Sequence, residues 1–562
     1  MRVTHDPAPL APTGVGSGGS APSAEPSGHV DGFCRDRLPP RALWPVLRHD
    51  LLPALAAHPP RLNAAVALLD AALAAGWGDR PLFRAGGETW SYARVAETSR
   101  RVARVLVDAL GLVPGNRVLL RAPNTPMHAA CWFAVLRAGG VAVCTMPLLR
   151  ARELAYVADR AAVDLALCDA RLAEACEAAM GSRPAGRSIC FAPDGSGALD
   201  ALVRRASDDA PACDTAADDV ALVAFTSGTT GEGKGTMHTH RDVLAVCDCF
   251  PPHVLRPTPD DVFGGTPPFA FTFGLGGLVL FPVRIGASAV LLEQGSPAAL
   301  LDAIERERVT VTFTAPTAYR AMAGLLAGRD VGALRRCVSA GEPLPRSTFE
   351  LWRSLTGIPI IDGIGATELL HIFISAADDD IRPGSTGRVV PGYEACVVDA
   401  AGREVPRGTV GRLAVRGPTG CRYLDDPARQ RAYVQHGWNL TGDSYVQDAD
   451  GWFWYQARTD DLIVSAGYNI AGPEVESALL QHEAVQECGV VGVPDAERGQ
   501  LVKAYVVLRP GVQPGPELAR ALQEHVKRTI APYKYPRAVA FVDALPRTAT
   551  GKLQRFRLRE GT

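Results

Sequence analysis

No uninterrupted apolar segment in this 562-residue sequence approaches the roughly 18 residues that a membrane-spanning helix requires. Even a long apolar stretch such as 273–283 (FGLGGLVLFPV) falls well short of that length, so the sequence predicts no membrane-embedded part. Residues 1–28 lack an apolar core and are rich in Pro, Gly, Ser and Ala, which excludes a secretory signal. We therefore expect residues 1–29 to form a disordered tail, because they offer little apolar surface to bury.

A strong excess of charge and a metal-binding cysteine pattern are also absent. The net charge is only -2 and the pI is about 6.6, which argues against nucleic acid as a partner. The 13 cysteines include no C-x-x-C pair, and the nearest two, Cys247 and Cys249, are separated by a single residue. A chain of this length does not need disulfides to fold, so we expect mostly buried, reduced thiols and a cytoplasmic protein.

The order of apolar runs indicates the fold class and the domains. Short runs such as 118–121, 141–145 and 221–225 alternate with helical stretches, as in parallel sheets covered by helices. After about residue 385 the pattern becomes that of antiparallel strands, and a new α+β unit begins near residue 460. The sequence therefore predicts an α/β protein. Its large N-terminal domain (30–459) has stacked, mostly parallel sheets and a small β subdomain, and a small α+β domain (460–562) follows.

A loop with the sequence FTSGTTGEGKG (225–235) follows the apolar strand at 221–224. Four glycines allow its backbone N–H groups to converge, and the hydroxyl side chains and one lysine add donors and positive charge suited to a polyphosphate. A flexible surface turn would need neither this length nor the cluster of hydroxyls. The residues predicted to bind phosphate are Thr226, Ser227, Gly228, Thr229, Thr230 and Lys234.

A nucleotide-triphosphatase P-loop is the rival interpretation, because Gly228 to Lys234 satisfies G-x-x-x-x-G-K. That loop requires Ser or Thr at the next position and a helix that starts at once. Here residue 235 is glycine, TMHTH reads as a strand, and the next helix is expected only near Arg241. The sequence therefore disfavours this alternative.

The loop resembles the signature of the adenylate-forming superfamily, which includes acyl-CoA synthetases, peptide-synthetase adenylation domains and luciferases. Gly233 departs from the family, which usually has proline there. Further motifs occur in the family's order over about residues 30–560. The resemblance implies binding of ATP with Mg²⁺, and a small domain that is mobile relative to the large one.

Two of these motifs resemble the family's adenine and metal sites. By resemblance, Gly341, Glu342 and Pro343 border the adenine; taken alone, they could equally form an ordinary turn. In the motif DGIGATE, glutamate is a hard oxygen ligand suited to magnesium, and threonine can hydrogen-bond the α-phosphate. Ile364 stands where the family commonly has an aromatic residue. The residues assigned to this motif are Asp362, Gly363, Ile364, Gly365, Thr367 and Glu368, with Glu368 as the metal ligand.

The remaining motifs resemble sites for ribose, the domain hinge and the reacting carboxylate. Asp443 and Arg458 match the ribose contacts, and Asp460 matches the hinge residue. Lys552 matches the lysine that reaches the acyl carboxylate and α-phosphate, while Gly467 belongs to the loop that replaces it for thioester formation. The resemblance therefore implies catalytic roles for Lys552, Glu368 and Thr367, with charge neutralisation and positioning in place of a general base.

Segments 268–276 and 365–373 resemble the acid-binding parts of benzoate and 2-aminobenzoate CoA ligases. The resemblance implies an aromatic carboxylic acid as substrate and coenzyme A as acceptor. The residues predicted to line the acid pocket are Phe271, Thr272, Phe273, His371 and Ile372. Core packing of Phe271 and Phe273, and a hydrogen-bonded core role for His371, remain open alternatives.

The function predicted is ATP-dependent formation of an aryl-CoA thioester, with 2-aminobenzoate or a related benzoate as the acid. Transfer to the phosphopantetheine arm of a carrier protein is the main alternative; a non-enzymatic ligand sensor and a luciferase-type oxygenase are two further ones. A monomer and a homodimer both remain possible, and the sequence does not choose the ring substituents.

Overall fold

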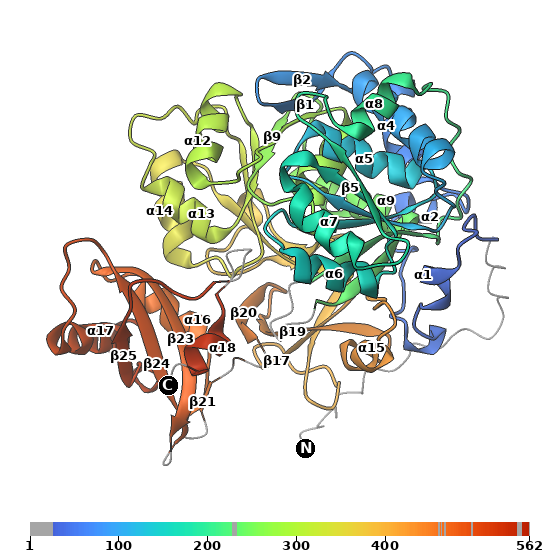
Figure 1. The fold of residues 1–562 in the computed structure, drawn as a ribbon. Helices are drawn as coiled ribbons and strands as arrows, with labels where there is room; N and C mark the ends of the chain where they lie inside the picture. Colours follow the sequence, from blue (N-terminus) through green and yellow to red (C-terminus); the bar gives the residue numbers. More distant parts are fainter. Residues whose placement is uncertain are drawn as a thin grey trace.

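The structure is a computed structural model that describes residues 26–226, 233–458, 461, 463–465, 468–495, 498–547 and 553–560. Within these residues the strands form four sheets (Figure 1). Two are large and mostly parallel, and two are smaller and contain antiparallel pairs. The sequence predicted strands that alternate with helices, followed by an antiparallel region, and this order is confirmed.

The six-stranded sheet has the order β6-β5-β3-β4-β7-β8. Its central strand, RVLLR, is buried at every position, as expected of a parallel strand covered on both faces. Only β7 and β8, which flank the predicted phosphate loop, pair antiparallel. The strands are β3 (Arg117–Arg121), β4 (Val141–Thr145), β5 (Leu165–Asp169), β6 (Arg187–Phe191), β7 (Val220–Phe225) and β8 (Gly235–Thr239).

The nine-stranded sheet has the order β15-β14-β13-β12-β11-β9-β10-β1-β2. Its middle strands run parallel, while β2, β14 and β15 run antiparallel to their neighbours. The strands are β1 (Pro81–Ala85), β2 (Glu88–Ser91), β9 (Val262–Gly265), β10 (Ser288–Val290), β11 (Val311–Thr314), β12 (Arg336–Ser339), β13 (Ile360–Gly365), β14 (Ile372–Ser375) and β15 (Arg388–Val389).

Two helices are buried on nearly every side: α5 (Pro126–Arg137), capped by Thr125, and α9 (His240–Phe250), capped by Thr239. They belong to one large core that also takes residues from both large sheets, such as Leu120 and Phe313. The other helices of the large domain are α1 (Phe33–Asp36), α2 (Pro53–Ala56), α3 (Ala71–Ala74), α4 (Tyr92–Arg104), α6 (Ala151–Arg160), α7 (Ala173–Gly181), α8 (Ala198–Arg205), α10 (Thr272–Leu275), α11 (Phe281–Ile285), α12 (Pro297–Arg306), α13 (Pro316–Ala323), α14 (Arg346–Thr356) and α15 (Pro427–Tyr433).

An antiparallel sheet follows in the chain, with the order β16-β17-β19-β18 and β20 paired to β19. Residues of this sheet, including Val415 and Phe453, extend the large core. Its strands are β16 (Glu394–Val398), β17 (Val410–Arg416), β18 (Val434–Gln435), β19 (Trp438–Gln447) and β20 (Phe453–Arg458).

The C-terminal unit has a sheet and a core of its own, and Figure 1 shows it in orange and red beside β17, β19 and β20. The sheet has the order β22-β21-β24-β23, with β25 parallel to β24. Its elements are β21 (Ile463–Ser465), β22 (Tyr468–Ile470), α16 (Gly472–Leu479), β23 (Val485–Asp495), β24 (Gly499–Leu508), α17 (Pro516–Thr529), β25 (Ala538–Phe541) and α18 (Arg555–Glu560).

The expected disordered tail needs a correction at its end. Ser27 Oγ and Gly28 N–H both donate hydrogen bonds to Asp219, and the His29 side chain is buried. A carboxylate that accepts from two neighbouring donors orders this short segment despite its polar composition. Residues 1–25 of the tail lie outside the described residues.

The cysteine prediction is confirmed, since all 13 cysteines are free and most are buried. In the described parts of the chain, no helix combines the length and apolar character needed to cross a membrane.

Candidate active site

The two ends of the phosphate loop are tied together. Thr226 N–H donates to the Lys234 carbonyl at 2.9 Å, and Lys234 N–H donates to Thr226 Oγ1 at 3.4 Å. Tyr156 adds a hydrogen bond from its hydroxyl to the Gly233 carbonyl at 3.0 Å. Helix α9 begins at His240, after strand β8, so the delayed helix expected from the sequence is confirmed. Ser227, Gly228, Thr229 and Thr230 lie outside the described residues.

Lys234 and Glu368 are far apart in the sequence, but both lie next to the same tyrosine, Tyr423. The Tyr423 hydroxyl donates to Glu368 Oε1 at 2.6 Å, and Lys234 Nζ lies 5.7 Å from the centroid of the Tyr423 ring. Sequence reasoning missed Tyr423, because a single aromatic residue in the segment CRYLDD shows no periodicity or motif. The structure therefore places a cation, an aromatic ring and a carboxylate beside the end of the phosphate loop.

Glu368 suits a magnesium ion that is held mainly by phosphate oxygens and water. The Glu368 carboxylate is buried. Its Oε1 accepts a hydrogen bond from Tyr423, and no hydrogen bond to its Oε2 is present among the described residues. No group of three or more His, Cys, Asp or Glu side chains within the described ranges is placed to hold a metal by itself. A single carboxylate next to a phosphate loop is the arrangement that Mg²⁺ commonly uses with nucleotides.

The DGIGATE motif forms the end of β13 and the turn after it. A Cβ on Gly363 would come within 2.9 Å of the Ile372 side chain, and a Cβ on Gly365 within 2.9 Å of the His371 carbonyl. The two glycines therefore allow β14 to approach closely. Burial raises the pKa of the Asp362 carboxyl to about 7, and its Oδ1 has no hydrogen-bond partner among the described residues.

Asp443 and Arg458, the predicted ribose pair, face each other across β19 and β20. They are directly paired in the strand register, and Arg458 Nη1 donates to Asp443 Oδ1 at 3.1 Å. Gly442 has a φ of 76°, and a Cβ there would lie 2.9 Å from Arg458 Nη2. Glycine at 442 thus permits both the positive φ within β19 and the close approach of the arginine.

The predicted adenine loop contacts the C-terminal unit. Gly341 has a φ of 90°, which favours glycine, and Pro343 follows two residues later. The side chain of Glu342 lies 3.5 Å from Arg547 Nη1. Arg547 stands five residues before Lys552 in the sequence, so the chain leading to Lys552 starts beside this loop. Lys552, Gly467 and Asp460 themselves lie outside the described residues.

The residues predicted to line the acid pocket lie at two places: Phe271, Thr272 and Phe273 at the N-terminus of α10, and His371 and Ile372 where β14 begins. His371 is 3% exposed, and neither ring nitrogen has a hydrogen-bond partner among the described residues. Ile372 is buried beside it, while Phe271, Thr272 and Phe273 are partly exposed. Thr272 also lines a small cavity together with Trp132 and Leu275.

Aromatic rings surround His371 on several sides. The ring centroids of four phenylalanines lie within 4.5–6.4 Å of the imidazole: Phe250, Phe273, Phe281 and Phe313. Burial lowers the pKa of His371 to about 3, so the imidazole is neutral at physiological pH. The Phe273 backbone opposes this lowering of the pKa, so a core role for His371 stays an alternative to a contact with the acid.

The chain belongs to the family of AMP-binding enzymes. The model of that family matches residues 71–422, and the model of the AMP-binding enzyme C-terminal domain matches residues 474–552. The relationship shows that the chain is an enzyme of the acid–thiol ligase class, whose members use ATP, Mg²⁺ and coenzyme A.

Named relatives cover nearly the whole chain. The benzoate–CoA ligase of Thauera aromatica is 34% identical over 523 residues, which are 92% of this chain and 99% of that protein. A crystal structure of the anthranilate CoA ligase AuaEII with anthranoyl-AMP matches with a TM-score of 0.86 and 33% identity, over 90% of this chain and 98% of that one. A benzoate CoA ligase from Burkholderia xenovorans LB400 matches with a TM-score of 0.81 and 33% identity, over 89% and 100%. The predicted α/β fold with a small C-terminal domain is confirmed by these structures.

Proposed function

We propose that this protein is an aryl-CoA ligase that activates 2-aminobenzoate or a closely related benzoate. It would adenylate the aromatic acid with ATP, release pyrophosphate, and transfer the acyl group to coenzyme A with release of AMP. One observation supports the proposal of an aromatic substrate. The neutral imidazole of His371 has no hydrogen-bond partner among the described residues and lies within a shell of phenylalanine rings.

The His371 shell explains why a ring with a polar substituent is favoured. Flat apolar surfaces pack an aryl ring well, and a buried polar group without a partner is unfavourable until a ligand supplies one. A neutral imidazole offers one donor and one acceptor, so it can accept from an amino or hydroxyl group on the ring. Relatives named for benzoate, 3-hydroxybenzoate and anthranilate support the same substrate class.

The chemistry proposed for the first step needs charge neutralisation more than proton transfer. Lys234 and the phosphate loop would hold the triphosphate, and Asp443 with Arg458 would hold the ribose. Glu368 is the residue that would hold magnesium, which supplies charge neutralisation on the phosphates when bound. Lys552 would bring the acyl carboxylate and the α-phosphate together, and Thr367 would bind an α-phosphate oxygen.

The second step is proposed to follow a rotation of the small domain about Asp460. This motion would exchange Lys552 for the loop that contains Gly467, and it is a hinge-type closure. The boundary between residues 459 and 460, the cytoplasmic location and the choice between a monomer and a homodimer belong to the same proposal. Loading of a carrier-protein phosphopantetheine thiol is the alternative for this step.

A pyrophosphate-release assay with benzoate, 2-aminobenzoate, 3-hydroxybenzoate, salicylate and phenylacetate tests the first step. We expect 2-aminobenzoate to give the highest kcat/KM, and release with none of these acids would contradict the proposal. Adding coenzyme A or a phosphopantetheinylated carrier protein separately then identifies the acceptor. The Lys552→Ala variant should lose about 100-fold or more in adenylation, because it removes a positioned charge.

The role of His371 is tested by the His371→Phe variant with two acids. We expect its KM for 2-aminobenzoate to rise about tenfold and its KM for unsubstituted benzoate to change less, because only the former offers a hydrogen-bonding substituent. Equal changes for both acids would show that His371 only fills space. The Phe250→Leu variant is the matched control, since it alters the same shell without removing a polar group.

A further inference from the structure

The turn η7 (Thr367–Leu369), which contains the proposed metal ligand, is held by outside side chains at each of its three residues. Each of these residues accepts one side-chain hydrogen bond from a distant part of the chain. The three bonds are His238 Nε2–H to the Thr367 carbonyl at 2.7 Å, the Tyr423 hydroxyl to Glu368 Oε1 at 2.6 Å, and the Thr419 hydroxyl to the Leu369 carbonyl at 2.7 Å.

The turn needs such support because its backbone is unfavourable. Leu370, which ends it, has a φ of 70° although it is not glycine, and its side chain is buried in the main core. A non-glycine residue in this region persists only where its surroundings determine the conformation. Inside the turn, Leu370 N–H donates to the same Thr367 carbonyl that accepts from His238.

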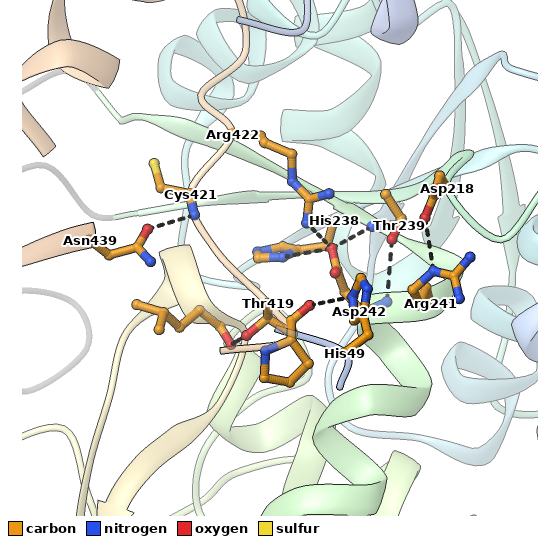
Figure 2. Close-up of polar contacts among 12 residues, drawn as sticks. His49, Asp218, His238, Thr239, Arg241, Asp242, Thr419, Cys421, Arg422 and Asn439 are labelled. Carbon is orange, nitrogen blue, oxygen red and sulfur yellow. Dashed lines mark hydrogen bonds and ion pairs between the residues drawn. The ribbon is translucent and has the colours of Figure 1, made fainter. Parts of the chain in front are cut away.

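The other ring nitrogen of His238, Nδ1, faces the buried ion pair of Asp242 and Arg422. Figure 2 shows Arg422 and His238 next to the Asp242 carboxylate, and His238 Nδ1 lies 3.7 Å from Asp242 Oδ2. Arg422 donates to Asp242 Oδ2, and the Thr239 N–H donates to the same oxygen at 2.9 Å. His238, Asp242 and Arg422 are all nearly inaccessible to solvent.

The Asp242 carboxyl is ionised at physiological pH. Burial alone would raise the pKa of this carboxyl, but the charge of Arg422 and the contacts with His238 and Thr239 bring it down to about 2. A carbonyl oxygen only accepts hydrogen bonds, so Nε2 of His238 must carry the proton that reaches Thr367. The imidazole is thus oriented with a donor toward the turn and with Nδ1 toward the charge pair.

The two sides of this arrangement also share backbone hydrogen bonds. Met237 N–H donates to the Arg422 carbonyl, and Leu424 N–H donates to the Gly235 carbonyl, both at 2.8 Å. Residues 422–424 therefore lie along β8, and Thr236 and Tyr423 form an isolated antiparallel bridge. Both His238 and Tyr423 are presented to the turn by one hydrogen-bonded unit.

We propose that His238, Tyr423 and Thr419 are positioning residues that keep the Thr367–Leu369 turn in the geometry required to bind ATP with Mg²⁺, and that Asp242 and Arg422 orient His238 for this task. The inference rests on the proposed function in one respect, the assignment of Thr367 and Glu368 to phosphate and magnesium. It adds residues that contact neither the acid nor the nucleotide in that assignment.

Two substitutions of His238 separate the hydrogen bond from the volume of the ring. In His238→Gln the amide nitrogen can take the place of Nε2, whereas in His238→Asn the shorter side chain places its nitrogen near Nδ1 and does not reach Thr367. Affinity for ATP is measured by calorimetry on the full chain without any acid, once with excess Mg²⁺ and once with EDTA. Adenylation is then measured as pyrophosphate release.

We expect His238→Asn to weaken binding of ATP with Mg²⁺ about tenfold and to slow adenylation by about 10- to 100-fold, while binding in EDTA changes less than about threefold. His238→Gln should stay within about threefold of the wild type in every measurement. Tyr423→Phe should reproduce the selective loss with Mg²⁺, because it frees the Glu368 carboxylate from its tether. Asp218→Asn is the matched control, since it breaks the exposed ion pair with Arg241 next to Asp242 and should change nothing.

Equal weakening with and without Mg²⁺, or equal behaviour of the Gln and Asn variants, would overturn the inference. If the Asn variant fails to fold, as judged by its thermal unfolding, the Tyr423→Phe variant decides the question by the same two titrations. If the wild type binds ATP with Mg²⁺ but adenylates no aryl acid, the proposed substrate is wrong, and the binding titrations still decide the role of His238.

Discussion

Two buried histidines border the same turn, and their surroundings are opposite. His238 is 0% exposed and lies between a carbonyl it donates to and the Asp242–Arg422 pair. His371 is 3% exposed and lies among phenylalanine rings, with no hydrogen-bond partner for either nitrogen among the described residues. Only three residues separate Thr367, which His238 contacts, from His371.

Under the proposals above, His238 would position other residues of the site, whereas His371 would contact the ligand. A buried imidazole with a partner contributes to the geometry of the protein, and its removal leaves another polar group unpaired. A buried imidazole without a hydrogen-bond partner adds little to the stability of the fold, so a role in binding a ligand is the better explanation for its presence. The turn therefore accepts hydrogen bonds on its side toward β8, although His238 Nδ1 has no hydrogen-bond partner among the described residues, and it borders phenylalanine rings on its side toward α10.

The largest effect is expected on the polar side, for Arg422→Met. The substitution leaves the Asp242 carboxylate buried without its counter-charge, which should lower the free energy of unfolding by about 3–5 kcal/mol. Urea denaturation measures the change. The double variant Arg422→Met with Asp242→Asn should recover much of the loss, and a single-variant loss below about 1 kcal/mol would contradict the paired description.

A smaller effect is expected on the apolar side, for Gly276→Ala. The added methyl group would lie 2.3 Å from Cδ2 of His371, so the ring has to move, at a destabilisation of about 1–3 kcal/mol. Activity with 2-aminobenzoate should fall as well, because the imidazole would leave its position. Gly181→Ala is the control, since a Cβ there meets nothing within 4 Å, and both variants behaving alike would argue against close packing around His371.

The smallest effect concerns the pH dependence of stability in His371→Phe. Because the folded-state pKa of His371 is lowered to about 3, the unfolded chain binds a proton near pH 6.5 that the folded chain does not bind. The stability associated with this group is therefore present above pH 6.5 and is lost as the pH falls toward 3. Phenylalanine takes up no proton, so the variant should gain about 1 kcal/mol relative to the wild type between pH 7 and pH 5.5.

Urea denaturation at several pH values measures this difference between the two proteins. The buried histidines His128 and His240 are present in both, so their contributions to the pH dependence cancel. A constant difference between the two proteins across that range would mean that the pKa of His371 is the same in the folded and the unfolded chain, which would contradict a buried, neutral imidazole.

Much of the fold could be predicted from local patterns. The run VLLR at 118–121 indicated a strand of a parallel sheet, and TMHTH before Arg241 indicated a strand followed by a delayed helix. These features were readable because periodicity and glycine act over a few residues.

The residues that complete the site could not be predicted in this way. Tyr423 and Thr419 sit in a segment without periodicity, and His238 reads as an ordinary strand residue. Their importance comes from hydrogen bonds that span between 50 and 129 positions of the sequence. No local pattern records such a pairing.

The sequence by itself indicated a polyphosphate-binding loop, because glycines, hydroxyl residues and a lysine occur there at short spacing. The resemblance of the ordered motifs to a known family implied the class of chemistry. From the sequence, an acid-binding role for Phe271, Phe273 and His371 stays a prediction beside the alternative of core packing. The tertiary structure decided which of two similar histidines is paired and which is not. The physical reason is that burial makes every polar group depend on its nearest partners, and those partners are chosen by the packing of distant strands.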